Sequence, residues 1–215
     1  MPADPTTAPD HGLAARGLAC WRGEHCLFRG LDLRLAPGEL LHIAGRNGSG
    51  KTTLLRILCG LVQADEGEIS WHGESIRHCR SEFNAALIYV GHLEGLKGEL
   101  TPLENLAMDQ ALNVARNAAD ASAALAGLGL ANRDDVPCRA LSAGQKRRVA
   151  LARLRVAEAQ LWVLDEPLTA LDPAGRQAVV DMLVEHARAG GMAIYTTHQP
   201  LELDGVTQRS MSLDS

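Results

Sequence analysis

Aromatic residues are scarce in this chain, which limits how its core can be built. Only 3% of its 215 residues are Phe, Trp or Tyr, while 46% are hydrophobic. The core must therefore be aliphatic and rest on Leu, Ala and Val. No apolar run approaches the roughly 18 residues that a membrane-spanning helix needs. The composition is typical of a globular domain with an aliphatic core.

Cysteines with the spacing of a metal or redox site are also missing. The five cysteines are odd in number and include no C-x-x-C pair, which favours a reducing compartment without disulfides. Basic residues are not in excess, because the net charge is −5. We therefore expect no nucleic-acid partner.

No internal repeat or low-complexity linker divides the chain, so its length suits one domain with a smaller subdomain. Residues 1–11 lack both the basic start and the apolar segment of a signal peptide, and we expect a flexible N-terminal tail there. Residues 12–215 are predicted to form the folded domain.

Short apolar segments predict strands toward both ends of the chain. Some alternate with polar residues and are typical of half-buried strands, and others are continuous and typical of strands covered on both faces. These segments are Leu31 to Leu35, "ELLHIA" (39–44), "GEISWHG" (67–73), "ALIYV" (centred on 87–90), "LWVL" (161–164) and "MAIYTT" (192–197).

Helix-start signals mark the middle of the chain. Thr101-Pro102-Leu103-Glu104 and Ser142-Ala143-Gly144-Gln145 both read as capping boxes. Alanine-rich helical sequence follows the first to about Gly127, and "KRRVALARLRVAEA" follows the second. Asp172-Pro173 starts a further helix that ends at Gly190-Gly191. We therefore predict an α/β core with a helical subdomain inserted at roughly 79–158.

A phosphate-binding loop follows the strand "ELLHIA". The segment "GRNGSGKT" (45–52) fits G-x-x-x-x-G-K-[ST] and precedes the helix "TTLLRILCG". Its backbone N–H groups and the helix N-terminus suit a phosphate, Lys51 would reach the β- and γ-phosphates of ATP, and Thr52 would bind Mg²⁺. The residues predicted to contact the nucleotide here are Gly45, Arg46, Asn47, Gly48, Ser49, Gly50, Lys51, Thr52 and Thr53.

Two carboxylates follow the buried strand "LWVL". Asp165 and Glu166 stand at its carboxyl end, where open α/β sheets bind ligands. We interpret Asp165 as the partner of Thr52 at Mg²⁺. Glu166 is then free to orient or deprotonate an attacking water.

Together these motifs resemble the ATP-binding cassette (ABC) ATPases. "LSAGQ" (141–145) resembles the signature motif LSGGQ, "ALD" (170–172) the D-loop, and "TTH" (196–198) the switch-histidine motif. Trp21 lies near the position of the aromatic that stacks on adenine. The resemblance implies a P-loop NTPase fold of the ABC type, with a RecA-like core, an antiparallel β edge and a helical subdomain. It also implies that His198 bonds the γ-phosphate or the water.

The same resemblance implies a head-to-tail homodimer. The capped helix at Ser142 presents backbone donors and a hydroxyl that can bind an anion. If Ser142 and Gly144 face a γ-phosphate, each nucleotide is held between Lys51 of one subunit and Ser142 of the other.

His92 indicates which branch of the ABC ATPases the chain resembles. The pattern Thr101-Pro102-Leu103-Glu104-Asn105-Leu106 resembles the family's T-x-x-E-N-L, and counting back from it places His92 where the family keeps the Q-loop glutamine. A Gly-His pair at this place resembles one branch, the ATP-binding subunits of the cytochrome c maturation (haem export) system. This implies a peripheral protein on the cytoplasmic face of the bacterial inner membrane. Its partners would be an integral membrane subunit (CcmB-like) and other cytochrome c maturation proteins.

Three alternatives stay open on the sequence. The first is the ATPase subunit of an ABC transporter for another substrate. The second is a soluble cassette ATPase acting on DNA or ribosomes, although this chain has neither a long coiled-coil insert nor tandem cassettes. The third is a P-loop kinase or GTPase, although the guanine-selective N-K-x-D does not occur and "LSAGQ" has no role there.

Overall fold

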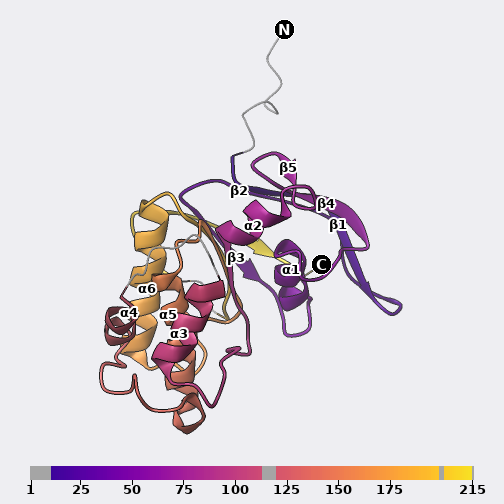
Figure 1. Ribbon diagram of the computed structural model, residues 1–215. Helices are drawn as coiled ribbons and strands as arrows, with labels where there is room; N and C mark the ends of the chain where they lie inside the picture. Colours follow the sequence, from indigo (N-terminus) through magenta and orange to yellow (C-terminus); the bar gives the residue numbers. More distant parts are fainter. Residues whose placement is uncertain (1–10, 113–119, 199–200, 215) are drawn as a thin grey trace.

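The computed structural model describes residues 11–112, 120–198 and 201–214. The predicted N-terminal tail lies outside the described residues, apart from His11. The described residues form two sheets with helices packed around them (Figure 1).

The larger sheet has five strands, and all its neighbouring pairs are parallel. Its order is β6 (Leu87–Val90), β7 (Leu161–Leu164), β8 (Met192–Thr196), β3 (Glu39–Ala44) and β9 (Thr207–Ser212). The predicted strands β3, β6, β7 and β8 are confirmed. β9 was not predicted, because its sequence "TQRSMS" is polar and lies at an edge of the sheet with most side chains exposed.

The smaller sheet is antiparallel and has the order β2 (His25–Leu35), β1 (Leu13–Arg22), β4 (Glu66–Trp71) and β5 (Glu74–Ser75). β4 was expected, and so was the second half of β2, from Leu31 to Leu35. β1 was not, because register shifts along its pairing with β2 break the alternation of buried and exposed residues that marks a strand. This sheet supplies the antiparallel β edge implied by the family resemblance.

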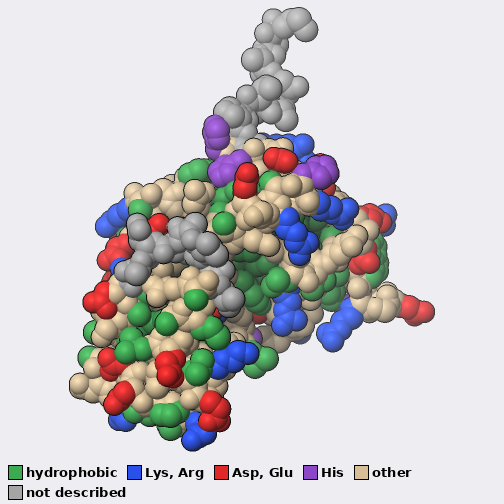
Figure 2. Space-filling model, in the orientation of Figure 1, with side chains coloured by type: hydrophobic (Ala, Val, Ile, Leu, Met, Phe, Trp, Pro, Cys, Tyr) green, Lys and Arg blue, Asp and Glu red, His purple; other side chains and the backbone are tan. Residues whose placement is uncertain are grey.

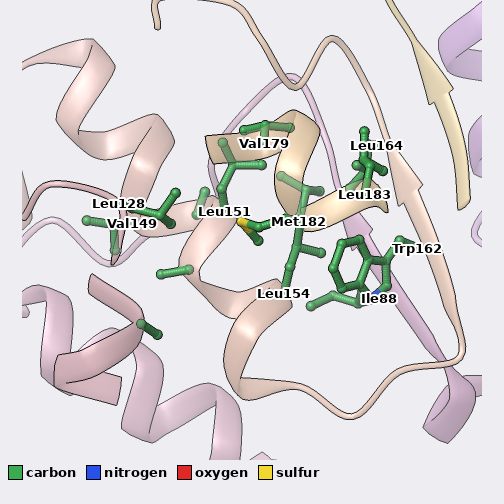
Figure 3. Close-up of a cluster of buried hydrophobic side chains, with 14 of the residues drawn as sticks. Ile88, Leu128, Val149, Leu151, Leu154, Trp162, Leu164, Val179, Met182 and Leu183 are labelled. Carbon is green, nitrogen blue, oxygen red and sulfur yellow. The ribbon is translucent and has the colours of Figure 1, made fainter. Parts of the chain in front are cut away.

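The core lies on both faces of the parallel sheet. In β7, Leu161 and Val163 pack on the side of α1 (Lys51–Leu58) and the antiparallel sheet. Trp162 and Leu164 pack on the opposite side, against α5 (Ala143–Val156) and α6 (Pro173–Arg188) (Figure 3). Alternate residues of a strand point to opposite faces, so a strand covered on both faces has to be apolar throughout.

The remaining helices are α2 (Arg80–Ala86), α3 (Pro102–Leu112), α4 (Ala121–Gly127) and the short 3₁₀ helix Cys138–Ala140. Figure 1 shows α3, α4, α5 and α6 gathered on one side of the molecule. Both predicted capping boxes form. Thr101 Oγ1 accepts from the Glu104 N–H at 3.2 Å, and Ser142 Oγ accepts from the Gln145 N–H at 3.2 Å. These caps satisfy N–H groups that a helix start leaves without a partner.

The predicted range of the helical subdomain, 79–158, includes β6, which pairs with β7 inside the parallel sheet. The helices α3, α4 and α5 follow β6 and lead back to β7. These helices therefore form the connection between the adjacent parallel strands β6 and β7. The division of residues 12–215 into a core and a subdomain stays a prediction.

Among the described residues, no helix is both long enough and apolar enough to cross a membrane. On the face that Figure 2 shows, acidic and basic side chains are interspersed.

Candidate active site

The phosphate loop joins β3 to α1 at the carboxyl edge of the parallel sheet. Gly50 is the N-cap of α1 and has φ +97°, in the left-handed region that favours glycine. The Lys51 ammonium donates to the carbonyl oxygens of Gly45 at 2.6 Å and Arg46 at 3.0 Å, which holds it over the loop. The buried Ser49 hydroxyl has no hydrogen-bond partner among the described residues, and a phosphate oxygen would satisfy it.

Two hydroxyl groups donate hydrogen bonds to Asp165, which directly follows β7. Thr52 Oγ1 donates to one carboxylate oxygen at 2.7 Å and Thr196 Oγ1 donates to the other at 2.9 Å. Asp165 is only 2% exposed, so these bonds replace much of the hydration that the carboxylate loses on burial. These hydrogen bonds hold Asp165 and Thr52 side by side, as predicted from their motifs.

Glu166 adopts a strained backbone conformation beside Asp165. Its φ is +51°, in a region that non-glycine residues seldom occupy. Its N–H donates to Thr196 Oγ1 at 2.8 Å, and its Oε2 lies 3.8 Å from His198 Nε2. The carboxylate and the imidazole therefore face a common space after β7 and β8.

That space belongs to a cleft of about 430 Å³. The cleft brings together residues that follow the carboxyl ends of four parallel strands, β3, β6, β7 and β8, because such ends meet at one edge of the sheet. Its lining residues are Arg22, Leu27, Asn47, Gly48, Gly50, Lys51, Thr52, Thr53, His92, Asp165, Glu166 and His198. His92, which we predicted from the family pattern, lies among them and is exposed.

Two lining residues were not predicted. Arg22 ends β1 and Leu27 lies near the start of β2, on the hairpin that approaches the phosphate loop. No motif marks them, because only the packing of the antiparallel sheet on α1 brings them there. Trp21 is half-buried and does not line this cleft, and its backbone N–H donates to Asp65 Oδ2 at 2.8 Å. Its contact with a base stays a prediction.

Ser142 and Gly144 also lie outside the cleft. Ser142 is exposed at the start of α5. A Cβ added to Gly144 would stand 2.6 Å from the Ala170 carbonyl oxygen, so the helix start packs closely on the segment after β7. Within one chain these residues do not meet the phosphate loop, and the predicted contact needs a second copy.

The oxygen atoms beside the phosphate loop are chemically suited to Mg²⁺. No group of three or more His, Cys, Asp or Glu residues with metal-site geometry occurs in the described part of the chain. The site offers one carboxylate and one hydroxyl, from Asp165 and Thr52. Mg²⁺ is commonly held by one or two carboxylates together with substrate phosphates and water. The residues therefore fit this ion in a nucleotide complex.

Comparisons with known proteins agree with this geometry. Residues 28–169 match the ABC transporter family. The chain is 48% identical over 207 residues to the cytochrome c biogenesis ATP-binding export protein CcmA of Nitrosomonas europaea, covering 96% of this chain and 97% of the relative. It is 50% identical over 198 residues to the protein of that name from Methylococcus capsulatus, covering 91% and 95%.

Solved structures share the fold at lower identity. A dimeric structure of a post-hydrolysis state of the ATP-binding cassette MJ0796, bound to ADP and Pi, has a TM-score of 0.78 and 22% identity, covering 87% of this chain and 88% of that chain. The ATP-binding subunit of another ABC transporter has a TM-score of 0.78 and 23% identity, covering 86% and 79%.

The fold and the cleft define an ABC-type nucleotide-binding ATPase. The chain belongs to the ABC transporter family and, within it, resembles the CcmA proteins over most of its length.

Proposed function

We propose that the chain is the ATP-binding and ATP-hydrolysing subunit of a membrane ABC transporter complex in c-type cytochrome biogenesis, concerned with haem export or delivery. The observation that carries this proposal is identity of 48–50% to several CcmA proteins across most of the chain. His92 supports it, because the residue that singles out this branch lines the same cleft as the phosphate loop.

In the proposed complex the phosphate loop binds ATP. Lys51 is the first residue of α1, and its ammonium lies over the loop, where it would contact the β- and γ-phosphates in place of the two carbonyls it now binds. Thr52 and Asp165 would hold Mg²⁺, which when bound offsets the negative charge of the phosphates. Trp21 would contact the adenine.

Three side chains would act on the attacking water. Glu166 would orient or deprotonate it, with its carboxylate aimed into the cleft by the turn after β7. His198, 3.8 Å from that carboxylate, would bond the water or the γ-phosphate. His92 lies on the other side of the β7 end and takes the place of the family's glutamine.

The proposed assembly is a head-to-tail homodimer docked on an integral membrane subunit of the CcmB type, at the cytoplasmic face of the inner membrane. The exposed, capped N-terminus of α5 supports the dimer, because Ser142 and Gly144 of a second copy would complete the γ-phosphate site. The exposed loop that begins at His92 supports docking nearby, since Leu93 is 79% exposed and offers apolar area to a partner.

The chemical step is tested by Glu166→Gln. Because a positioned base contributes about 10²–10⁴-fold, turnover should fall by that factor while ATP still binds. Steady-state phosphate release and binding of a fluorescent ATP analogue measure the two effects. Glu185→Gln is the control, since Glu185 is an exposed residue of α6 that pairs with Arg155 on the surface. An active Glu166→Gln enzyme would show that Glu166 is not the base.

The biological role is tested by deleting the gene in its own host and staining cell proteins for covalently bound haem. The stain should disappear from c-type cytochromes and return with the wild-type gene but not with Glu166→Gln. Unchanged c-type cytochromes would exclude the cytochrome role. They would leave an ATPase subunit for another transport substrate.

A further inference from the structure

Arg147 of α5 is a buried cation next to the active site. Its side chain is surrounded by protein, with the residue only 3% exposed. The guanidinium donates to four main-chain carbonyl oxygens, those of Gly91 at 2.7 Å, Asp165 at 2.7 Å, Glu166 at 2.9 Å and Pro167 at 3.3 Å. Burying a charge is costly unless it is well hydrogen-bonded. The four carbonyl oxygens provide these hydrogen bonds, so the position of the Arg147 guanidinium is tied to theirs.

Three of the four acceptors are consecutive residues. In an extended strand successive carbonyls point to alternate sides, so three in a row reach one guanidinium only where the chain curls. The chain turns in this way at Glu166, whose φ of +51° is unusual for a residue other than glycine. Such conformations persist where the surrounding structure maintains them, and here Arg147 donates to three carbonyl oxygens of this turn.

The fourth acceptor lies on a different strand end. Gly91 follows β6 and directly precedes His92. One side chain therefore joins three parts of the site: the helix that Ser142 caps, the turn that carries Glu166, and the start of the loop that carries His92. A guanidinium is suited to this because its five N–H groups are fixed in one plane.

We propose that Arg147 is a positioning residue that holds Glu166 in its strained conformation and fixes the His92 loop relative to it. The proposal rests on the function above, in which Glu166 and His92 act on one water. A lysine would keep the charge, but its three donors leave from a single atom and cannot reach both strand ends. A glutamine would leave most of the carbonyls without a donor.

Amide hydrogen exchange of the full chain tests whether Arg147 holds the Glu166 turn and the His92 loop, and it does not require ATP hydrolysis. The Asp165 N–H now bonds the Val90 carbonyl at 2.8 Å, and the Thr169 N–H bonds the Glu166 carbonyl at 3.2 Å. In Arg147→Gln, exchange should rise about tenfold or more in 165–171 and in 91–97, because buried carbonyls lose their donors. Segments 39–44 and 192–196 should keep the wild-type rate. Arg155→Gln, an exposed residue of the same helix, is the control.

Kinetics test the consequence for catalysis. Arg147→Gln should lower kcat roughly 10- to 100-fold, since small misplacements of catalytic groups cost this much. The affinity for ATP should stay within about threefold, because Arg147 makes none of the hydrogen bonds of the phosphate loop. Arg147→Lys should lie between wild type and Arg147→Gln in both kcat and exchange.

The outcomes separate this inference from the proposed function. Unchanged exchange in 165–171 and 91–97, or a uniform rise along the whole chain in both Arg147 variants, overturns the positioning role. A wild-type chain without ATPase activity would count against the proposed function. The exchange data would still decide whether Arg147 holds the turn.

Discussion

Thr52 Oγ1 donates a hydrogen bond to Asp165 Oδ2 over 2.7 Å, joining two residues 113 positions apart in the chain. The contact links the start of α1 to the end of β7. It exists because β3 and β7 run parallel in one sheet and end at the same edge. Thr196, the last residue of β8, which lies between β3 and β7, completes the link by donating to the other carboxylate oxygen. Burial and these two bonds fix the Asp165 carboxylate beside Thr52.

Asp165→Asn should lower the apparent affinity for Mg²⁺ in ATP hydrolysis. The amide keeps an acceptor for Thr52 or Thr196 but loses the negative charge that attracts the ion. The Mg²⁺ concentration for half-maximal activity should rise about 10- to 100-fold, as for other changes around metal ligands. A Mg²⁺ titration at fixed ATP measures it, with Asp181→Asn on the exposed side of α6 as the control. An unchanged titration would remove Asp165 from the proposed metal site.

His92→Gln should keep ATPase activity within roughly tenfold of wild type, because an amide offers the same kind of donor and acceptor as a neutral imidazole. His92→Leu offers neither and should lose more. Steady-state hydrolysis by the three proteins compares them. If His92→Leu is as active as wild type, the side chain has no part in handling the water, although it lines the cleft.

Much of the active site could be predicted from the sequence because its motifs are short and continuous. The phosphate loop, Asp165, Glu166 and His198 each follow a strand that is visible as an apolar run. Parallel pairing then places the ends of those strands together. The position of His92 came from the family pattern, and the structure places it in the same cleft.

The residues that sequence reasoning missed depend on contacts between distant segments. Arg147 lies in a helix with several other basic residues, and nothing in the local sequence distinguishes it from Lys146 and Arg148, which are only partly buried. Only the burial of α5 against β7 and β6 brings its guanidinium to four carbonyls. Arg22 and Leu27 reach the cleft through the packing of the antiparallel sheet. The register shifts in β1 interrupt the alternation of apolar and polar residues that would have predicted this strand and its pairing with β2.

Gly144→Ala should destabilise the fold even without nucleotide. A Cβ at this position would meet the Ala170 carbonyl oxygen at 2.6 Å, and Ala170 already has a φ of +62°. Relieving such a clash between backbone segments costs about 1–3 kcal/mol. Urea unfolding of Gly144→Ala measures the cost. Ala143→Gly is the control, because Ala143 is exposed at the same helix start. Equal stability of Gly144→Ala and wild type would mean that the segment after β7 moves away freely.

His186 should make the stability of the fold sensitive to acid. Its ring stacks on Trp162 with centroids 3.8 Å apart, and its Nε2 lies 3.1 Å from the Met192 carbonyl oxygen. Burial lowers the pKa of His186, and hydrogen bonds to the Met192 and Gln160 backbone oppose this without cancelling it. A cation near a helix C-terminus would be favoured by the helix dipole, so the lowered pKa means that loss of hydration dominates here.

The direction of the pH effect follows from that lowered pKa. An unfolded chain protonates this histidine near its usual pKa of about 6.5, whereas the folded chain does so only at lower pH. The stabilisation is therefore complete above about pH 6.5 and declines as pH falls toward the folded pKa, by at most about 1.4 kcal/mol per pH unit for one proton. Urea unfolding of wild type and His186→Gln at several pH values measures it, with the exposed His78→Gln as control. The difference between wild type and His186→Gln should shrink as pH falls below 6.5, because the wild type alone loses this term. A difference independent of pH would show that the ring titrates equally in both states.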